Sequence, residues 1–563
     1  MTDSIVRGAP LSEENLGALT LGGFLREICD KHSDREAMVF YPPTGPAIRY
    51  SYAQLWDEAH AIARALAARG VTKETRVGLM ATNRPEWVTA MFGIALAGGT
   101  CVAFSTFAKG AELEYMLRIS DVSLLIFERE ILKRDFAHEI MACCPELGTT
   151  DDTIYSPNMP FLRNAVCIGS TESLGGAVES WDDFLASDRK VSADLLDAIS
   201  AEVAPSDRGL IFFSSGSTAQ PKGMAQTHRA ATIQYWRWPR IYGFDTEVRT
   251  WTANGFFWSG NFTQAIGATL SFGGSMVLQR YFDAAEALTL IEKERVTLPV
   301  AWPHQWVQLI EAPNWKDVDL SSLRYVADHS PLHNHPTVQC QWQEPTAAYG
   351  NSETLTLSSV HPSGTDPDFV ADTHGIPLPG NIFKIVDPDT GKVLPRGESG
   401  EIAVKGPTMM LSYLRMAPDE IFDEDGFFHT GDGGYFDEHD RLHWHGRIND
   451  IIKTGGANVS PEEVDTVIAR IPGVKRTQTV GVPHDTLSEM VVACIVPLEG
   501  AALDENTLDE ATVIAELKKQ LASYKVPRRV LFFDEQDFAL TGNEKVKASE
   551  LREKVAKRLA DEP

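Results

Sequence analysis

The sequence has 563 residues, 43% of them hydrophobic, and a formal net charge of -27. This length exceeds the roughly 250 to 300 residues at which a single hydrophobic core stops growing, so it predicts at least two domains. With 78 acidic residues against 51 basic ones, the chain repels phosphate polymers and anionic bilayers, which argues against nucleic acid and membrane partners. Any phosphate site must therefore be built from local lysines and backbone N–H groups.

The cysteines and the apolar stretches predict a cytoplasmic protein. Seven cysteines are scattered along the chain without a Cys-x-x-Cys spacing, which is typical of reduced and mostly buried thiols. The first residues lack the basic region and apolar run of a secretory signal. The most apolar stretch, residues 87–104, contains three glycines and two threonines, so we expect a buried helix running into a strand, not a membrane span.

Helical and strand-like segments alternate through the first three quarters of the chain. Residues 55–69 place apolar side chains at helical spacing, and short apolar runs such as residues 124–127 and 209–213 predict buried strands. This alternation predicts layered α/β subdomains with largely parallel sheets. We expect residues 128–188, with scattered prolines and a Gly-Gly pair, to form an irregular insertion.

The sequence composition changes toward the C-terminus. Residues 387–398 are rich in turn formers, and residues 400–405 predict a strand. Beyond residue 450 we expect a helix at 462–470 and strands near 477–482 and 490–496, enough for a small α+β domain. The predicted fold class is thus α/β, with a large N-terminal domain over residues 1–447 and a small C-terminal domain over residues 448–563.

A loop rich in hydroxyls follows the predicted strand at residues 209–213. Its residues are Ser214, Ser215, Gly216, Ser217, Thr218, Ala219, Gln220, Pro221, Lys222 and Gly223. Backbone N–H groups, hydroxyls and a lysine in such a loop can surround phosphate oxygens, although a plain turn has the same composition. The spacing differs from Gly-x-x-x-x-Gly-Lys-Ser/Thr, so a Walker-type nucleotide switch is not indicated.

This segment resembles the phosphate loop of the adenylate-forming superfamily, which includes acyl-CoA synthetases, peptide-synthetase adenylation domains and beetle luciferases. A second motif follows in the family's order: Tyr349, Gly350, Asn351, Ser352 and Glu353 resemble its Tyr-Gly-x-Thr-Glu segment. The resemblance implies that the tyrosine ring lies on adenine and that Glu353, with Ser217, binds Mg²⁺. A carboxylate is the hard oxygen ligand that Mg²⁺ prefers.

Two further segments resemble nucleotide contacts of the family. Residues 426–432 match its Gly-Trp-Phe-x-Thr-Gly-Asp motif, so Asp432 is expected to accept hydrogen bonds from both ribose hydroxyls. Arg447 matches the arginine that reaches the ribose or the phosphates. Ser330 lies where the family has a Gly-Ala-Pro-Leu segment near adenine, with His329 as a departure.

The C-terminal part resembles the mobile domain that family members rotate between two half-reactions. The resemblance places the hinge at Asn449, with the adjoining Asp450 as a residue that can share the role. It places Lys453 and Gly456 in the segment that admits the pantetheine arm of coenzyme A, where a residue without Cβ suits close approach. Lys545 matches the catalytic lysine that would neutralise charge on the α-phosphate and the attacking carboxylate. Ala219, Asn449 and Glu544 depart from the family's usual residues.

The aromatic segment at residues 254–262 resembles the lining of the family's acyl pocket. Trp258, Gly260 and Asn261 are the predicted substrate contacts. The preceding aromatic side chains of residues 235–242 have two interpretations, a pocket lining or, more commonly for such clusters, ordinary core. The segment favours a medium-to-large hydrophobic acid over acetate.

The resemblance implies an AMP-forming carboxylate–CoA ligase. The resemblance assigns catalytic roles to Lys545, Lys222 and Glu353. It implies ATP and coenzyme A as co-substrates and Mg²⁺ as the metal ion. Two alternatives stay open: an adenylating enzyme that delivers its acyl group to a separate carrier protein, and a non-catalytic nucleotide- or acyl-binding protein. The sequence also leaves open a homodimer, the identity of the acid and the resting orientation of the C-terminal domain.

Overall fold

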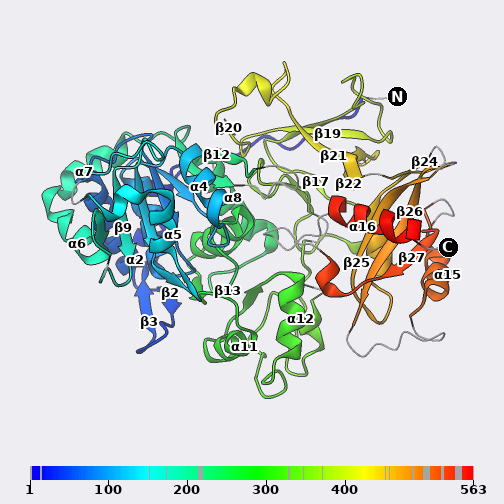
Figure 1. Cartoon of the computed structure of the whole chain (residues 1–563), viewed down its shortest axis with the longest axis horizontal. Coiled ribbons are helices and arrows are strands. Elements are labelled where there is room, and N and C mark those ends of the chain that lie inside the picture. The colour runs from blue at the N-terminus through cyan, green and yellow to red at the C-terminus, as the bar shows by residue number, and fades with distance from the viewer. Residues whose placement is uncertain are drawn as a thin grey trace.

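Three large sheets lie within the first 447 residues, and a fourth lies beyond them, in the computed structural model of the chain (Figure 1). The residues that it describes are 3–12, 16–150, 153–172, 174–213, 220–327, 330–345, 348–370, 372–450, 452–454, 457–484, 487–498, 508–521, 525–538 and 548–561. Among them, no helix combines the length and the apolar character needed to cross a bilayer. The seven cysteines are all free, and six of them are buried.

The largest sheet has eight strands and is parallel except at one edge, where β12 and β20 run antiparallel to their neighbours. Its order is β10 (Val178–Ser180), β9 (Asn164–Ile168), β6 (Leu124–Glu128), β4 (Arg76–Met80), β5 (Thr100–Ala103), β11 (Arg208–Phe213), β12 (Gly223–Thr227) and β20 (Ser412–Tyr413). Strand β6 is apolar on both faces, as expected for a parallel strand covered on both sides. Leu124 and Ile126 join one core cluster, whereas Leu125 and Phe127 join another.

Helices cover both faces of this sheet. The helices that contribute to the first cluster include α1 (Leu21–His32), α2 (Tyr52–Ala67), α3 (Pro85–Leu96), α6 (Trp181–Ala186) and α7 (Ala193–Ala201). Those of the second are α4 (Gly110–Ile119) and α5 (Phe136–Cys143). Helix α2 begins with a capping box between Ser51 and Gln54, which satisfies backbone donors at its N-terminus.

The prediction of an irregular insertion over residues 128–188 was wrong in part. Strands β9 and β10 of this segment extend the eight-stranded sheet, and a short hairpin of β7 (Glu130–Ile131) and β8 (Arg134–Asp135) precedes α5. Strand β9 is only five residues long, and the periodicity of so short an apolar run does not reveal that it belongs to a sheet.

A second sheet runs in the order β15 (Leu298–Val300), β13 (Arg249–Thr252), β14 (Ser275–Leu278), β2 (Glu36–Phe40) and β3 (Ile48–Ser51). All its pairs are parallel except β2 with β3. Helices of this region are α8 (His228–Tyr242), α9 (Ser259–Asn261), α10 (Thr269–Ser271), α11 (Ala284–Lys293) and α12 (Pro303–Glu311). Between α9 and α10, the π-helix η4 (Phe262–Ala268) packs on α8, where Gly267 leaves room for the ring of Tyr235.

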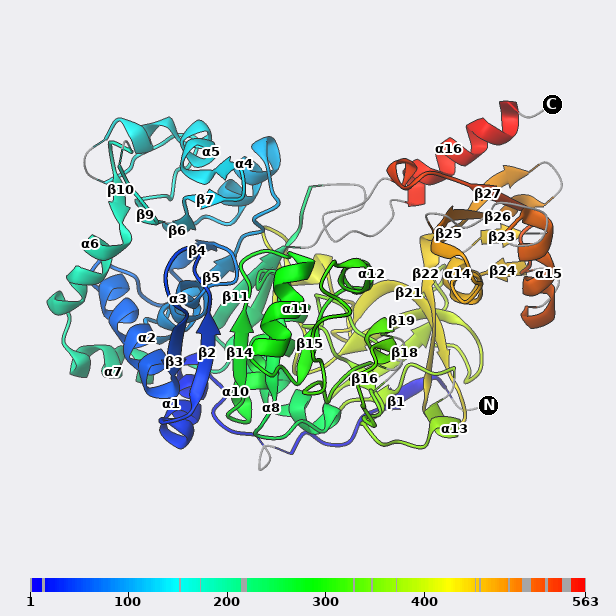
Figure 2. The same cartoon turned by 90° about the horizontal axis from the view of Figure 1, so that it is seen from below.

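The third sheet is antiparallel, so the expectation of largely parallel sheets holds only for the first two. Its order is β1 (Ile5–Arg7), β18 (Ile382–Val386), β19 (Gly400–Lys405), β21 (Phe428–Phe436) and β22 (Leu442–Arg447). Figure 2 shows the first strand beside β18 at one end of the molecule, whereas α1 and α2 lie at the other end. The small pair β16 (Ser359–Val360) and β17 (Ile376–Pro377) and helix α13 (Pro367–Val370) belong to the same region.

The C-terminal part has its own sheet and core. Its strands are β24 (Ala457–Val459), β23 (Ile452–Thr454), β26 (Ser488–Pro497) and β25 (Val474–His484), with β27 (Arg529–Phe532) also paired to β26. Its helices are α14 (Pro461–Ile468), α15 (Glu510–Gln520) and α16 (Ala548–Asp561). Two hydrophobic clusters fill this part, and all their buried members lie between Ile452 and Val555. The predicted helix and strands of this part are therefore confirmed, with wider bounds for the strands.

Short helical turns complete the described fold. They are η2 (Pro145–Gly148), η3 (Ser187–Lys190), η5 (Pro331–Asn334), η6 (Pro418–Glu420), η7 (Ile448–Asp450) and η8 (Glu535–Asp537).

The carboxylate of Asp465 on α14 makes the C-terminal part sensitive to pH. Its Oδ1 accepts hydrogen bonds from Thr477 Oγ1 at 3.0 Å and Thr479 Oγ1 at 2.7 Å. Burial nevertheless dominates and raises the pKa of Asp465 from 3.8 to about 6. Because the folded pKa is the higher one, this group favours the folded state at low pH, and that advantage is lost as pH rises from 3.8 to about 6.

We predict that Asp465→Asn stabilises the protein at pH 8 and has little effect at pH 4. A difference of about two between the folded and unfolded pKa values corresponds to about 3 kcal/mol, which is the upper limit of the gain. Calorimetric unfolding between pH 4 and 8 measures it, with the exposed Asp534→Asn as the control. An equal pH dependence of the two variants would show that Asp465 carries no such penalty.

Candidate active site

Segments far apart in the sequence meet at Asp432, near the middle of β21. The Tyr349 Oη donates a hydrogen bond to Asp432 Oδ2 at 2.8 Å, and Arg447 Nε lies 3.1 Å from Asp432 Oδ1. Arg447 ends β22 and faces Asp432 across the ladder, so the antiparallel register itself sets this pair. The structure thus brings together three of the predicted nucleotide contacts.

Local backbone geometry directs the Asp432 carboxylate inward. Gly431 has a φ of +70°, a left-handed conformation that glycine adopts without a Cβ penalty. The Asp432 N–H donates to Thr430 Oγ1 at 3.1 Å, and Arg447 Nη1 donates to the Thr430 carbonyl at 2.6 Å. The Thr-Gly-Asp sequence therefore forms a rigid bend whose parts hold both Asp432 and Arg447.

Asp432 is only 3% exposed, whereas the Arg447 side chain is 53% exposed. Burial raises the pKa of Asp432 above its ordinary value, and the Arg447 guanidinium and the Tyr349 hydrogen bond oppose that rise. Tyr349 is also buried, and its own pKa is raised by burial and by the Asp432 charge. The Tyr349 hydroxyl therefore donates to the Asp432 carboxylate, and the partly exposed Arg447 guanidinium lies beside this pair.

Glu353 belongs to a second group of side chains. Tyr413 Oη donates to Glu353 Oε1 at 2.7 Å, and Lys222 Nζ lies 4.9 Å from the centroid of the Tyr413 ring. Burial and the Glu353 charge raise the pKa of Tyr413. Tyr413 thus links the predicted metal ligand to the lysine of the phosphate loop, and sequence reasoning missed it because it lies outside every motif.

The rest of the Tyr349–Glu353 motif packs between these groups and the acyl segment. A Cβ on Gly350 would lie 1.5 Å from the Thr356 carbonyl oxygen, so only glycine fits there. Asn351 Oδ1 accepts from the Thr354 N–H at 3.0 Å, which closes a local turn. Ser352 Oγ accepts a hydrogen bond from Ser259 Oγ at 3.3 Å, and this contact joins the nucleotide motif to the acyl segment.

Of the three predicted substrate contacts in the acyl segment, Asn261 is buried and holds the loop, whereas Gly260 and Trp258 are less enclosed. Asn261 is buried, and its amide donates to the Asn254 carbonyl and accepts from Thr252 Oγ1, so it holds the loop in place. Gly260 has only Thr356 Cγ2 near its Cβ direction, at 3.8 Å, and Trp258 is partly exposed with its ring 5.0 Å from that of Phe257. The four aromatic side chains of residues 235–242 are buried and belong to the core.

Three further predicted residues lie on other elements. Ser330 is buried, and its Oγ accepts from the Leu332 N–H at 3.4 Å at the start of η5. Asn449 belongs to η7, directly after β22, and Lys453 is exposed on β23. The predicted residues 214–218, Gly456 and Lys545 lie outside the described part of the chain, as do the departures Ala219, His329 and Glu544.

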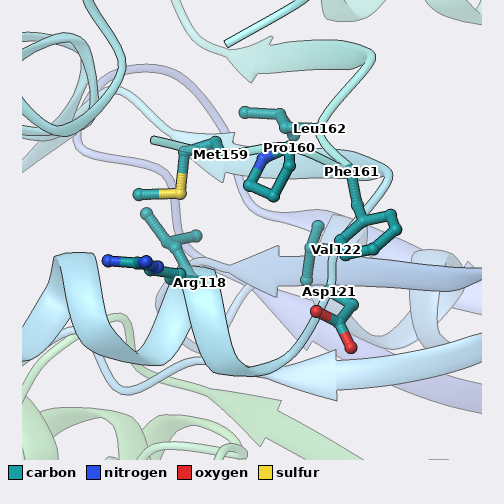
Figure 3. Close-up of a pocket in the computed structure, with 8 residues that line it drawn as sticks. Arg118, Asp121, Val122, Met159, Pro160, Phe161 and Leu162 are labelled. Atoms are coloured by element: carbon teal, nitrogen blue, oxygen red, sulfur yellow. The ribbon is translucent and has the colours of Figure 1, made fainter. Parts of the chain in front are cut away.

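The surface also carries small hollows away from these motifs. One, of about 240 Å³, lies between the end of α4 and residues 159–162 (Figure 3). Figure 3 shows Met159 and Phe161 around its rim, with Arg118 and Asp121 on the opposite side. None of its lining residues belongs to the predicted site, so we do not assign it to the reaction.

Comparison with known proteins assigns the chain to a family. The sequence profile described as AMP-binding enzyme matches residues 25–414, and that described as AMP-binding enzyme C-terminal domain matches residues 463–545. The first match spans more than half of the chain. The chain therefore belongs to the AMP-binding enzyme family.

Curated relatives are similar over nearly their whole length. A mitochondrial medium-chain acyl-CoA ligase of Danio rerio is 28% identical over 99% of this chain and 92% of its own. A (7a-methyl-1,5-dioxo-octahydro-1H-inden-4-yl)propanoyl:CoA ligase of Mycobacterium tuberculosis is 30% identical, covering 86% of this chain and 90% of its own. An indoleacetate–CoA ligase of Aromatoleum aromaticum is 29% identical, covering 95% and 98%.

Solved structures share the fold. ATP-bound MatB of Rhodopseudomonas palustris has a TM-score of 0.70 and 26% identity, covering 95% of this chain and 99% of its own. An anthranilate CoA ligase in complex with anthranoyl-AMP has a TM-score of 0.77 at 23% identity, covering 98% and 100%. The large N-terminal and small C-terminal domains of the fold are thus shown.

We predict that Tyr349→Phe destabilises the protein by about 1.5 to 3 kcal/mol, because a buried carboxylate loses a hydrogen bond. Thermal unfolding measures the change. Tyr235→Phe is the matched control, since the buried Tyr235 hydroxyl has no hydrogen-bond partner in the described part of the chain, and its removal should be neutral. Equal stability of the two variants would remove the Tyr349–Asp432 bond from the interactions that hold the site.

Proposed function

We propose that this protein is an AMP-forming carboxylate–CoA ligase. It joins a carboxylic acid to ATP with release of pyrophosphate, and it then transfers the acyl group from the acyl-adenylate to the thiol of coenzyme A. The observation that carries the proposal is the meeting of Asp432, Tyr349 and Arg447 beside Glu353, Tyr413 and Lys222. Its family membership and the activities named for its relatives agree with it.

The Asp432 group suits the ribose of the nucleotide. Each oxygen of an ionised carboxylate can accept more than one hydrogen bond, so Oδ1 and Oδ2 can receive ribose hydroxyls while Arg447 and Tyr349 keep their places. Arg447 pairs with Asp432 through Nε, so the outer part of its half-exposed guanidinium can meet a phosphate while the pair stays in place. Because burial raises the pKa of Asp432, the site works only above that pKa, where the acceptor is ionised.

Glu353 and Lys222 suit the phosphate end. Mg²⁺ is commonly bound through one or two carboxylates plus the phosphates of its nucleotide. Glu353 is partly exposed, and among the described side chains Tyr413 donates to its Oε1, so this donor set fits Mg²⁺ delivered with ATP, with Ser217 as a further ligand. Bound Mg²⁺ would offset phosphate charge, and the Lys222 ammonium would add to that effect.

No protein nucleophile is needed for either step. The carboxylate of the acid attacks the α-phosphorus and pyrophosphate leaves; the CoA thiol then attacks the acyl carbon and AMP leaves. The protein contributes by holding the reactants close and by stabilising phosphate charge. We assign the second part of that work to Lys545 and to the hydroxyls of residues 214–218.

We place the domain boundary after Arg447, with Asn449 as the hinge. Support comes from the end of β22 at Arg447, the single turn η7 that follows, and the separate hydrophobic clusters on the two sides. Lys453 and Gly456 would then act in the thioester step. With all cysteines unpaired, we propose a reducing compartment, the cytoplasm, as the place of action.

We further propose a medium-to-large hydrophobic acid as the substrate. The partly exposed Trp258 precedes Gly260 by two residues, and its ring lies 5.0 Å from the buried ring of Phe257; apolar aromatic surface in this segment favours an apolar acyl group. Relatives whose names refer to medium-chain acids and indoleacetate are consistent with this class.

Pyrophosphate release from Mg·ATP tests the function, measured over short, medium, long, aromatic and polycyclic acids with and without CoA. We expect acid-dependent release, with an acyl-CoA product only when CoA is present. Release that CoA neither accelerates nor converts to thioester would favour an enzyme that serves a carrier protein. No release with any acid would favour a binding protein.

Lys545→Ala should reduce adenylation by about a hundredfold or more, because stabilisation of transition-state charge is lost. ATP binding should change little. Pyrophosphate release and equilibrium binding of ATP measure the two effects, with Lys547→Ala as the neighbouring control. Normal pyrophosphate release by Lys545→Ala, with a defect in Lys547→Ala, would move the role to Lys547.

A further inference from the structure

Two buried glutamines hold the segment that joins the nucleotide motif to the acyl segment. Gln226 Nε2, at the end of β12, donates to the carbonyls of Ser352 at 3.1 Å and Glu353 at 3.4 Å. Gln234 Nε2, on α8, lies near three further carbonyls: Leu355 at 2.8 Å, Leu357 at 2.9 Å and Thr354 at 3.4 Å. Both side chains have no exposed surface.

The held segment has a backbone that its residues do not favour. Leu355 has a φ of +51° and Thr356 a φ of +79°. Two consecutive non-glycine residues in this region are unusual, and a β-branched residue such as threonine is a marked outlier. Such a turn persists only where surrounding contacts over-determine it, and the Gln234 amide lies on three of its carbonyls.

This turn touches both halves of the site. The Thr356 N–H donates to the Asn351 carbonyl at 2.8 Å, and the Thr356 carbonyl fills the space beside Gly350. On the other side, Thr356 Oγ1 lies 3.1 Å from Thr263 Oγ1 at the start of the π-helix. A shift of the turn therefore moves the nucleotide motif relative to the acyl segment.

The glutamine oxygens show which end of each amide is needed. The carbonyls of the turn can only accept hydrogen bonds, so the amide nitrogens must face them. Among the described residues, neither Oε1 of Gln226 nor Oε1 of Gln234 has a hydrogen-bond partner, and burying these oxygens costs free energy that burying a leucine would not. The donor groups are what the glutamines contribute.

We infer that Gln226 and Gln234 are positioning residues, which hold the Leu355–Thr356 turn in its strained form and so set the acyl site against the nucleotide site. The inference rests on the proposed ligase function for its catalytic consequence. Neither glutamine touches a reacting atom, and each acts through the backbone of residues 352–357.

Gln234→Leu tests this inference. We expect amide hydrogen exchange in residues 350–360 to rise about tenfold or more, because the turn loses its donors. The KM for the acid should rise about tenfold while the affinity for ATP changes less than about twofold, since Asp432 and Arg447 are not touched. A variant that merely contained less folded protein would lower kcat and leave the KM for the acid unchanged.

Gln279→Leu is the matched control. Gln279 is also buried, its Nε2 also donates two hydrogen bonds, to the Asp283 carbonyl and Glu286, and its Oε1 also has no partner. It lies after β14, away from the turn, so its variant should leave exchange in residues 350–360 and the KM for the acid unchanged. Equal effects of the two variants would overturn the inference.

A second substitution tests the strain directly. Glycine adopts positive φ without a Cβ penalty, so Thr356→Gly should make the turn less dependent on Gln234. Adding Gln234→Leu to Thr356→Gly should then raise exchange in residues 350–360 by less than it does in the parent chain. Fully additive effects would show that Gln234 does not hold a strained turn.

The two proposals can fail separately. If the parent protein releases no pyrophosphate with any acid, the ligase function fails, and the exchange measurements still decide the role of the glutamines. If the parent protein is active but exchange in residues 350–360 is unchanged by Gln234→Leu, the positioning role fails alone.

Discussion

The buried carboxylate of Asp432 is the constraint around which the site is arranged. It is only 3% exposed, so it must be paired, and its partners come from Tyr349, 83 residues earlier, and from the neighbouring strand β22. Pairing this one group therefore fixes the loop after residue 348 against the antiparallel sheet. A buried carboxylate left without these partners would cost more than the fold can easily offset.

The proposed nucleotide site has to attract an anion in spite of the chain's own charge. A net charge of -27 opposes nucleotide binding at long range, yet salt screens that repulsion beyond about 8 to 10 Å. Among the described residues, Arg447 lies beside Asp432 and Lys222 lies beside Tyr413. Local placement of two cations thus outweighs a global excess of acids, because Coulomb interactions strengthen at short separation and in a poorly solvated site.

The strained turn at residues 355–356 connects the nucleotide motif with the neighbouring acyl segment. Ser259 with Ser352, and Thr263 with Thr356, connect the acyl segment to the nucleotide motif by hydroxyl contacts. Hydroxyls alone permit several arrangements, whereas buried amide donors to fixed carbonyls permit few. The geometry of adenylation would then depend on side chains that never meet the substrates.

Sequence reasoning reached the fold class and most of the elements that carry the site. The strands at residues 124–128 and 400–405 were predictable because their apolar residues are contiguous or regularly spaced, and the match of the motifs to a family placed Asp432, Arg447 and Glu353 in one site. The segment at residues 128–188 was misjudged, because β9 is short and its sheet partners lie far away in sequence. Tyr413, Gln226 and Gln234 carried no sequence signal, since a lone tyrosine or glutamine has no periodicity or spacing to mark it.

The sequence by itself determined which residue types were available and in what order: a hydroxyl-rich loop, a Tyr-Gly-Asn-Ser-Glu segment, a Thr-Gly-Asp bend and a C-terminal domain. These features are local, because turn formation and hydrophobic periodicity depend on residues that are neighbours in the sequence. Only the tertiary structure decided that Tyr349 donates to Asp432, that Tyr413 bridges Glu353 and Lys222, and that two glutamines hold the turn at residues 355–356. Those pairings depend on strand register and on burial across long separations, where many arrangements compete and only the packed core selects one.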